Sequence, residues 1–308
     1  MYKIPGIPNQ YSCSNEIADF VELGCVLKKT ISMREVIAAI NRIAENDYSG
    51  GVVEEEQVDV KVESAFSELE DRINYTNKNY PFSIDVTGNV LAIENGTEGT
   101  PNYWLYVYLL LATRLNMQKN RIFSSIDGSL LFEELSAQIA VNYLGDRAES
   151  IVFGTAAGQE KFEEKINGLC KFLNEGNCFK NRDTNPPTAK DRKLDVVVMK
   201  HFTDKKPGKI IGFGQCKTGT NWKDYLTQLR PDSFCTKWLD DSPTVLPVRL
   251  FFLCEALSRS TWHSSSSDAG ILFDRCRLMD YSNSIEQDLL EKIQNWTMGA
   301  LEFVDQQS

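Results

Sequence analysis

The chain contains 308 residues, of which 42% are hydrophobic and 25% charged, a composition typical of a globular protein rather than a disordered one. Its formal net charge of −10 excludes a surface that is basic all round, because nucleic-acid affinity depends largely on Lys and Arg. The amino-terminal residues MYKIPGIPNQ lack the apolar centre of a signal peptide, and the longest apolar run, Trp104 to Ala112, is too short to span a bilayer. We therefore expect a cytoplasmic protein with no membrane partner.

The cysteines do not form a metal-binding pattern. There are eight of them, scattered along the chain without a CxxC pair, and the chain has only two histidines. This spacing argues against a structural zinc site. We expect ordinary reduced thiols, in keeping with a cytosolic location.

The amino-terminal part is predicted to be mainly helical. A helical apolar pattern precedes Ser32, and Ser32-x-x-Glu35 is a capping box that predicts a helix starting at Met33. A third apolar face predicts a helix from Val58 to Ile73. Two short strands flanking a turn at Gly88 are predicted to form a β-hairpin. Three helices followed by a hairpin is the order found in a winged helix.

The charge of the third predicted helix argues against DNA binding by this region. Its acidic residues outnumber its basic ones: Asp59, Glu63, Glu68, Glu70 and Asp71 against Lys61 and Arg72. Such a surface repels phosphate, so a structural or partner-binding module is the better interpretation. The glycines and proline between Glu94 and Asn102 predict a domain boundary, with an acidic helical module in residues 1–98 and a second domain in residues 99–308.

The second domain opens with two predicted helices. Trp104 to Leu115 reads as an apolar core helix, and a helix from Ser129 is predicted to end at Gly145 as its C-cap. The run Ile151 to Phe153 is predicted as an additional strand. A further helical pattern begins at Phe162.

The candidate site residues are concentrated in the stretch from Lys190 to Trp222. Leu194 to Met199 and Lys209 to Phe213 are predicted as two strands joined by a polar loop. Asp195 opens the first strand, and Gln215-Cys216-Lys217 closes the second. This hairpin brings a carboxylate, an amide oxygen, a backbone carbonyl and an ammonium to one end of a sheet, which is an oxygen-ligand set for a hard divalent cation.

The same stretch is locally basic. Residues 190–230 contain ten Lys or Arg against four Asp, which is consistent with a phosphate-bearing partner. The alternative for Lys205, Lys206 and Lys209 is that they only keep the hairpin loop soluble. The small residues Gly212, Gly214 and Gly219 are predicted to allow the close approach of a large ligand.

The remainder of the chain is predicted to complete an α/β domain. The expected elements are a short helix, a buried strand, a loop, a last strand and a closing helix, over Trp222–Leu229, Leu246–Leu253, Ser264–Ser267, Ile271–Leu278 and Ser284–Phe303. The last strand is predicted to carry two outward basic residues, Arg275 and Arg277. Pro231 is predicted to follow the end of the short helix.

Asp195 followed by Gln215-x-Lys217 resembles the split signature of the PD-(D/E)xK nuclease superfamily, in the variant where Gln replaces the usual acidic residue, as in Mrr-like restriction endonucleases. Phe132-Glu133-x-Leu135 is similar to the start of the helix that contributes an acidic residue in that family. The resemblance covers roughly residues 129 to 280. It implies an α/β fold with a restriction-endonuclease-like mixed sheet flanked by helices, beside the winged-helix-like module.

The resemblance also implies a site and a function. Mg²⁺, for which Mn²⁺ substitutes, would be bound by Asp195, Gln215, the Cys216 carbonyl and Glu133, with Glu134 and Glu163 as alternatives to Glu133. Lys217 would orient or activate the attacking water. The implied activity is that of a metal-dependent endonuclease that cuts DNA, with RNA as the less expected substrate. The implied role is in restriction or antiphage defence, with a helicase or ATPase as protein partner. The alternative is a catalytically silent nuclease fold that binds nucleic acid or acts as a scaffold.

Overall fold

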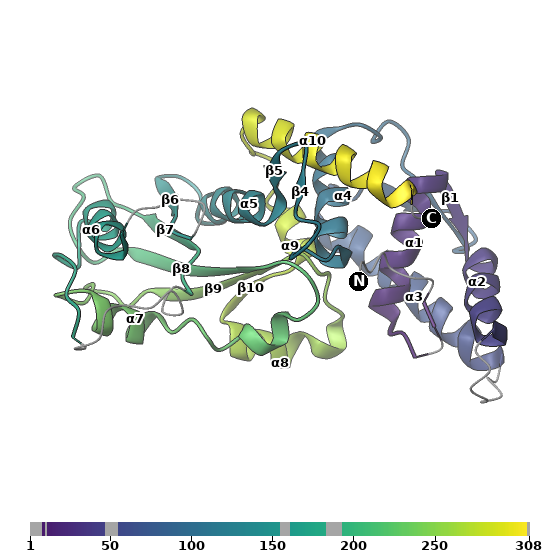
Figure 1. Cartoon of the computed structure of the whole chain (residues 1–308), viewed down its shortest axis with the longest axis horizontal. Helices are drawn as coiled ribbons and strands as arrows, with labels where there is room; N and C mark the ends of the chain where they lie inside the picture. Colours follow the sequence, from purple (N-terminus) through teal and green to yellow (C-terminus); the bar gives the residue numbers. More distant parts are fainter. Residues whose placement is uncertain (1–7, 10, 47–54, 155–160, 183–192, 307–308) are drawn as a thin grey trace.

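The structure is a computed structural model that describes residues 8–9, 11–46, 55–154, 161–182 and 193–306. The segment 183–192, which contains Lys190 and Arg192 of the predicted basic stretch, lies outside the described residues. Figure 1 shows the amino-terminal helices at one end of the molecule and a β-sheet covered by helices at the other.

The amino-terminal module consists of three helices and a small sheet. Its elements are, in order, α1 (Ser14–Lys28), β1 (Thr30–Ser32), α2 (Met33–Asn46), α3 (Glu55–Tyr75), β2 (Phe82–Ile84) and β3 (Val90–Ile93). The capping box is confirmed, since the Ser32 backbone N–H donates to the Glu35 carboxylate at 2.7 Å and Glu35 N–H donates to Ser32 Oγ at 3.3 Å. The predicted hairpin is confirmed as β2 and β3.

Strand β1 was not predicted from the sequence. It begins after Lys29, whose left-handed backbone (φ 73°) turns the chain at the end of α1. It then pairs antiparallel with β3, which gives the sheet order β1-β3-β2. Three residues are too few to show a period-2 pattern, so this strand depends on its partner.

The second part of the chain forms an α/β domain. Its elements are α4 (Pro101–Arg114), β4 (Ile122–Phe123), β5 (Ile126–Asp127), α5 (Gly128–Leu144), β6 (Ala148–Val152), α6 (Phe162–Leu173), β7 (Val196–Lys200), β8 (Ile210–Lys217), the 3₁₀ helix η3 (Trp222–Tyr225), α7 (Pro231–Trp238), β9 (Val248–Leu253), α8 (Arg259–Ala269), β10 (Ile271–Phe273), α9 (Arg275–Asp280) and α10 (Gln287–Asp305). The predicted helices over α4, α5, α6 and α10 and the strand over β6 are confirmed.

The five longer strands form one mixed sheet in the order β10-β9-β8-β7-β6. Strand β7 is antiparallel to both of its neighbours, β6 and β8, whereas β8, β9 and β10 run parallel. The expected hairpin is therefore at the centre of the sheet, and β6 supplies an edge strand next to it.

Helices cover both faces of this sheet, as Figure 1 shows for α4, α5 and α10 on one side and α7 and α8 on the other. Successive residues of a strand point to opposite faces. In β8, Ile211 and Phe213 pack in a buried cluster with residues of α6 and α7. On the opposite face, Val198, Leu250 and Phe252 belong to the cluster that includes α4, α5 and α10.

Three predictions for the region after the hairpin were wrong. Only η3 forms where a helix was expected, and Pro231 begins α7 instead of following a helix, because proline fits the first helical position, where no N–H is needed. Ser264–Ser267 lie in α8, where Ser267 Oγ donates to the His263 carbonyl at 2.8 Å. The last strand stops at Phe273, since Asp274 caps α9 by accepting from Arg277 N–H at 3.0 Å.

The prediction that Arg275 points outward was also wrong. Arg275 is fully buried, and its Nη1 lies 2.9 Å from Asp19 and 3.0 Å from Glu22 of α1. Arg72 of α3 pairs with the same two carboxylates, at 2.8 Å each. Arg114 of α4 pairs with Asp19 at 2.7 Å.

These five residues, named here the buried ion network, connect the amino-terminal module to the α/β domain. The apolar core is also continuous across residue 98, because one cluster contains residues of both parts. The division into domains 1–98 and 99–308 stays a prediction. Within the part of the chain described, no helix has the length and apolar character needed to cross a bilayer, and all eight cysteines are free thiols.

Candidate metal-dependent hydrolytic site

Asp195 lies where three strands come together. Its backbone N–H donates to the Gly214 carbonyl of β8 at 2.9 Å, and its own carbonyl accepts from Phe153 N–H at 2.7 Å and Gly154 N–H at 3.1 Å, just past β6. Its carboxylate accepts from the Cys216 backbone N–H at 2.8 Å. Both the backbone and the side chain of Asp195 are therefore held at this corner of the sheet.

The environment of Asp195 favours the neutral carboxyl. Burial raises its pKa to about 6, and this rise is limited by the hydrogen bond from Cys216 N–H and by the positive charges of Lys217 and Lys193. Ionised Asp195 therefore has a desolvation cost that these groups only partly offset.

Gln215 and Lys217 are on the face of β8 that also carries Ile211 and Phe213, by the alternation of the strand. Gln215 is only 1% exposed, and neither its Oε1 nor its Nε2 has a hydrogen-bond partner among the described residues. A buried amide without partners costs about 1–3 kcal/mol. This cost is removed if a ligand or ion supplies the missing partner.

Lys217 is partly exposed at the end of β8, with its ammonium 4.4 Å from the centroid of the Tyr225 ring in η3. A cation over an aromatic face is weakly attracted, by about 0.5–1 kcal/mol at exposed sites. Tyr225 was not singled out from the sequence, because an aromatic residue in a short polar segment carries no chemical signal of its own. It restrains the ammonium without neutralising it.

Cys216 contributes its backbone, not its thiol. Burial, followed by the negative charges of Asp195 and Glu133, raises the pKa of this thiol well above its usual range, so it is neutral and unsuited to nucleophilic attack. In an extended strand the N–H and C=O of one residue point toward the same neighbour. The Cys216 carbonyl therefore points to the side on which its N–H meets Asp195, as the metal-ligand prediction requires.

Glu133 of α5 is the helix carboxylate that reaches this corner. It is buried, and a Cβ placed on Gly154 would lie 2.9 Å from the Glu133 carboxyl carbon. Gly154 is the residue whose N–H bonds to the Asp195 carbonyl. The absence of a side chain at Gly154 is thus what lets the Glu133 carboxylate approach the strand end.

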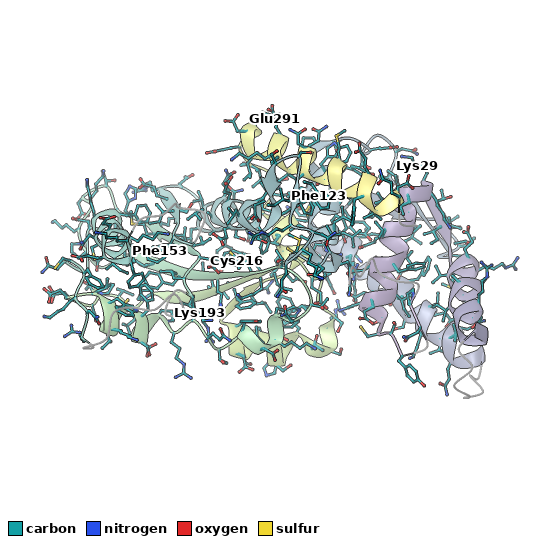
Figure 2. All side chains as sticks on the ribbon, in the orientation of Figure 1. Lys29, Phe123, Phe153, Lys193, Cys216 and Glu291 are labelled. Carbon is teal, nitrogen blue, oxygen red and sulfur yellow. The ribbon has the colours of Figure 1, made fainter. Side chains whose placement is uncertain are left out.

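The two alternative glutamates lie elsewhere. Glu134 forms an ion pair with Lys292 of α10 at 2.8 Å on the surface. Glu163 is exposed in the first turn of α6. The structure therefore brings Asp195, Gln215, Cys216 and Lys217 to one corner and Glu133 to the adjoining Gly154, whereas Glu134 and Glu163 lie elsewhere. Figure 2 labels Cys216 within the sheet and Phe153 beyond the end of β6.

The predicted roles of some neighbouring residues were wrong. Lys209 is buried and donates to the Leu173 carbonyl at 2.5 Å, 3.5 Å from Glu175, so it neither keeps the hairpin loop soluble nor meets a ligand. Gly212 and Gly214 make room for core side chains, Leu250 and Phe252, instead of an external ligand. Gly219 has φ of 79°, and a Cβ placed on it would lie 3.9 Å from Asn221 Oδ1.

The residues present are suited to a hard cation. Carboxylates, an amide oxygen and a backbone carbonyl are ligands of Mg²⁺ type, and the buried Gln215 amide lacks a partner within the described residues. Among those residues, no three His, Cys, Asp or Glu side chains are grouped so as to hold a metal ion. A cation here would depend on the two neutral oxygens as well as on Asp195 and Glu133.

The elevated pKa of Asp195 predicts a pH-dependent effect of the substitution Asp195→Asn. A carboxyl whose folded pKa is raised from 3.8 to about 6 stabilises the fold below pH 3.8, and this stabilisation is lost as the pH rises through 6. Asparagine does not ionise, so the stability of the variant does not fall as the pH rises. The variant should therefore be more stable than wild type by about 1–2 kcal/mol at pH 8, a value reduced for the partial exposure of the site. The difference should shrink toward pH 5.

Urea unfolding of both proteins in EDTA at pH 8 and pH 5.5 measures this difference. The exposed Asp59→Asn in α3 is the matched control and should show no such pH dependence. Equal stability of wild type and Asp195→Asn at pH 8 would contradict the desolvation of Asp195.

Comparison of the chain with protein-family models, curated protein sequences and solved structures gives no match.

Proposed function

We propose that this protein is a metal-dependent endonuclease that hydrolyses phosphodiester bonds in DNA. The observation that carries the proposal is the bond from Cys216 N–H to the Asp195 carboxylate at 2.8 Å, beside the buried amide of Gln215, which has no hydrogen-bond partner in the described part of the chain. This contact joins the two halves of the Asp195 and Gln215-x-Lys217 signature at one corner, which supports the resemblance to PD-(D/E)xK nucleases.

The arrangement of the sheet supports the same assignment at the level of the fold. An acidic helix, α5, precedes the strands, and the hairpin of β7 and β8 is central, with β9 parallel to β8. The strand β6 stands next to the hairpin on the other side. This order fits the helix, hairpin, helix and strand skeleton that the resemblance implies.

Each residue at the corner has a distinct part in hydrolysis. A bound Mg²⁺ would polarise the scissile phosphate and activate a water at neutral pH. Asp195 and Glu133 would supply anionic oxygens, while Gln215 and the Cys216 carbonyl supply neutral ones. Lys217 is a compact ammonium that orients the water and offsets negative charge developing on the phosphate.

The proposal is tested by incubating the purified protein with supercoiled plasmid and Mg²⁺. Nicked or linear DNA should appear, and EDTA should prevent it. A parallel incubation with structured RNA distinguishes the substrates. DNA that stays intact over a range of Mg²⁺ and Mn²⁺ concentrations would contradict an endonuclease.

Restoring an acidic residue at position 215 should separate the stability of the fold from metal binding. In EDTA, Gln215→Glu should destabilise the protein by about 1–3 kcal/mol, because it buries a carboxylate in place of a neutral amide. The added charge should also raise the affinity for Mg²⁺ by at least ~10-fold. Urea unfolding and titration calorimetry measure the two effects.

Gln118→Glu on the exposed surface is the control for the charge alone. An unchanged Mg²⁺ affinity in Gln215→Glu would place the cation elsewhere.

A catalytically silent subunit is the second candidate, and the neutral Gln215 favours it, because one anionic ligand is missing relative to an acidic version of the signature. Such a protein would bind nucleic acid without cutting it. Gln215→Glu discriminates here too, since a silent fold that lacks only this charge should acquire cleavage.

The amino-terminal module is proposed to contact a protein partner, such as the helicase or ATPase that the resemblance implies in restriction or antiphage defence. Its three helices and its sheet order β1-β3-β2 support a winged-helix-like arrangement. The outward face of α3 is more acidic than its sequence indicates, because Arg72 is buried in the ion network while Asp59, Glu63 and Glu70 are exposed. This face is unsuited to DNA phosphate.

A further inference from the structure

A pocket with basic lining lies next to the proposed catalytic corner. Its volume is about 440 Å³, and its polar lining residues are Lys193, Gln228, Arg230, Ser233 and Lys237. We name it the basic groove. Three of these residues are cationic, and none of the described lining residues is acidic. A concave site with an excess of one charge concentrates ligands of the opposite charge.

The basic groove adjoins the corner through Lys193. This residue lines the groove and is two positions before Asp195 in the chain. Figure 2 shows the Lys193 side chain extending away from the sheet on the side of α7 and α8. Lys193 therefore belongs to the groove through its side chain and lies close to the candidate corner through its place in the chain.

Helix α7 forms a wall of the groove and packs against residues next to the candidate corner. The Phe234 ring packs edge-on against Phe153 at 6.0 Å and against Phe213 at 5.6 Å. Phe153 follows β6 directly before Gly154, and Phe213 is in β8 two residues before Gln215. The groove and the corner are consequently parts of one rigid packing unit.

Two further contacts of the basic side chains surround the groove. Burial lowers the pKa of Arg249 most; Asp268 raises it, and the adjacent charge of Arg230 lowers it. Lys237 holds its ammonium 4.7 Å from the Trp238 ring centroid, over an aromatic face. Arg230 and Arg249 are like charges close to each other, and a bound anion lowers the electrostatic energy of such a pair.

The apolar wall indicates which part of a nucleic acid fits. Phe234 and Trp238 are 6% and 2% exposed, and their ring faces are occupied by other aromatic residues. No ring face among these lining residues is open for a base to stack on, so the groove offers cations and hydrogen-bond donors, which suit phosphate, but no platform for base stacking.

We propose that the basic groove binds the sugar–phosphate backbone of the nucleic-acid strand that continues from the scissile phosphate, without regard to sequence. This inference rests on the proposed function, because it assigns the groove to the same substrate. It predicts that Arg230 and Lys237 position the strand and that neither takes part in the chemistry.

The test measures binding separately from cleavage. Fluorescence anisotropy with labelled oligonucleotides of mixed sequence is recorded in EDTA over a range of salt concentrations. The double variant Arg230→Gln, Lys237→Gln should bind at least ~10-fold more weakly than wild type at 100 mM salt, and its slope of log affinity against log salt should be less negative by about 1.4–1.8. Oligonucleotides of unrelated sequence should lose affinity equally.

Lys206→Gln is the matched control, since Lys206 is highly exposed on the hairpin loop. Its ammonium lies 3.8 Å from the Asp204 carboxylate, which is a weak ion pair. Unchanged affinity and salt slope in the double variant would overturn the proposal. Displacement of the oligonucleotide by inorganic phosphate, but not by chloride at equal ionic strength, would assign the groove to free phosphate instead.

The outcomes for groove and function are distinguishable. If wild type cuts plasmid while the double variant binds normally, the groove assignment fails and the nuclease stands. If wild type does not cut but the double variant loses binding, the groove stands and the endonuclease fails.

Discussion

Replacing Lys217 by alanine is expected to lower the rate of Mg²⁺-dependent DNA cleavage by about 10²–10³-fold, while the protein remains folded. Lys217 is partly exposed at the end of β8, so its loss opens no cavity in the core. Its ammonium stands beside Asp195, whose pKa it lowers, and is available to a developing negative charge. Removing one electrostatic stabiliser of a transition state typically has an effect of this size.

The measurement is a time course of plasmid nicking under single-turnover conditions, with protein in excess of DNA. Lys217→Arg retains the charge but replaces the compact ammonium by a planar fork, so it should recover only part of the rate. Lys206→Ala on the exposed hairpin loop is the control and should cleave at the wild-type rate. Cleavage by Lys217→Ala within ~3-fold of wild type would remove Lys217 from the chemistry.

Replacing Arg275 by methionine is expected to destabilise the protein by about 3–5 kcal/mol, the largest effect on stability that the structure predicts. Arg275 lies between Asp19 and Glu22 at 2.9 and 3.0 Å, and its Nε donates to the Cys254 carbonyl at 2.9 Å. Burial alone raises the pKa of Asp19, but Arg275, Arg114 and Arg72 together hold it below its usual range. Without Arg275 these buried carboxylates lose a counter-charge.

Urea unfolding monitored by tryptophan fluorescence gives this free energy. Arg259→Ala is the control, since its side chain is 76% exposed and lies 3.7 Å from Asp71, an arrangement that contributes no more than about 1 kcal/mol. If Arg275→Met lowers the free energy of unfolding by less than about 1 kcal/mol, the ion pairs of the network stabilise the fold by little more than the cost of burying their charges.

The buried ion network also reaches toward the candidate corner. Arg275 donates to Thr113 Oγ1 at 3.1 Å, and the neighbouring Ala112 carbonyl accepts from Gly219 N–H at 3.0 Å. Gly219 is two residues beyond Lys217. These two hydrogen bonds and short stretches of backbone connect the amino-terminal module to the end of β8.

Local sequence patterns were sufficient to predict most of the helices and strands. The capping box at Ser32 and the C-cap at Gly145 marked helix ends correctly, because these signals act within one turn of the chain. The apolar runs of β7, β8 and β9 were found from their β-branched and aromatic residues. The fully apolar strands of a buried sheet carry this signal most strongly.

Elements that depend on distant partners were missed or misplaced. The strand β1 exists because β3 is beside it. The apolar pattern predicts a strand from Ile271 to Leu278, whereas the structure has α9 from Arg275 onward. An arginine appears as a surface residue in the sequence unless its carboxylate partners are known, and those of Arg275 are more than 250 residues away in α1.

The candidate site divides in the same way. The sequence by itself predicted that Asp195, Gln215, Cys216 and Lys217 lie at one end of a hairpin, since both strands carry polar residues at that end. It could not choose between Glu133, Glu134 and Glu163, because each begins a helical turn with similar neighbours. Only the tertiary structure shows that Glu133 is the one of the three that lies next to this end of the sheet, against Gly154. It also separated the buried Lys209 from the basic groove, because burial depends on packing across the whole fold.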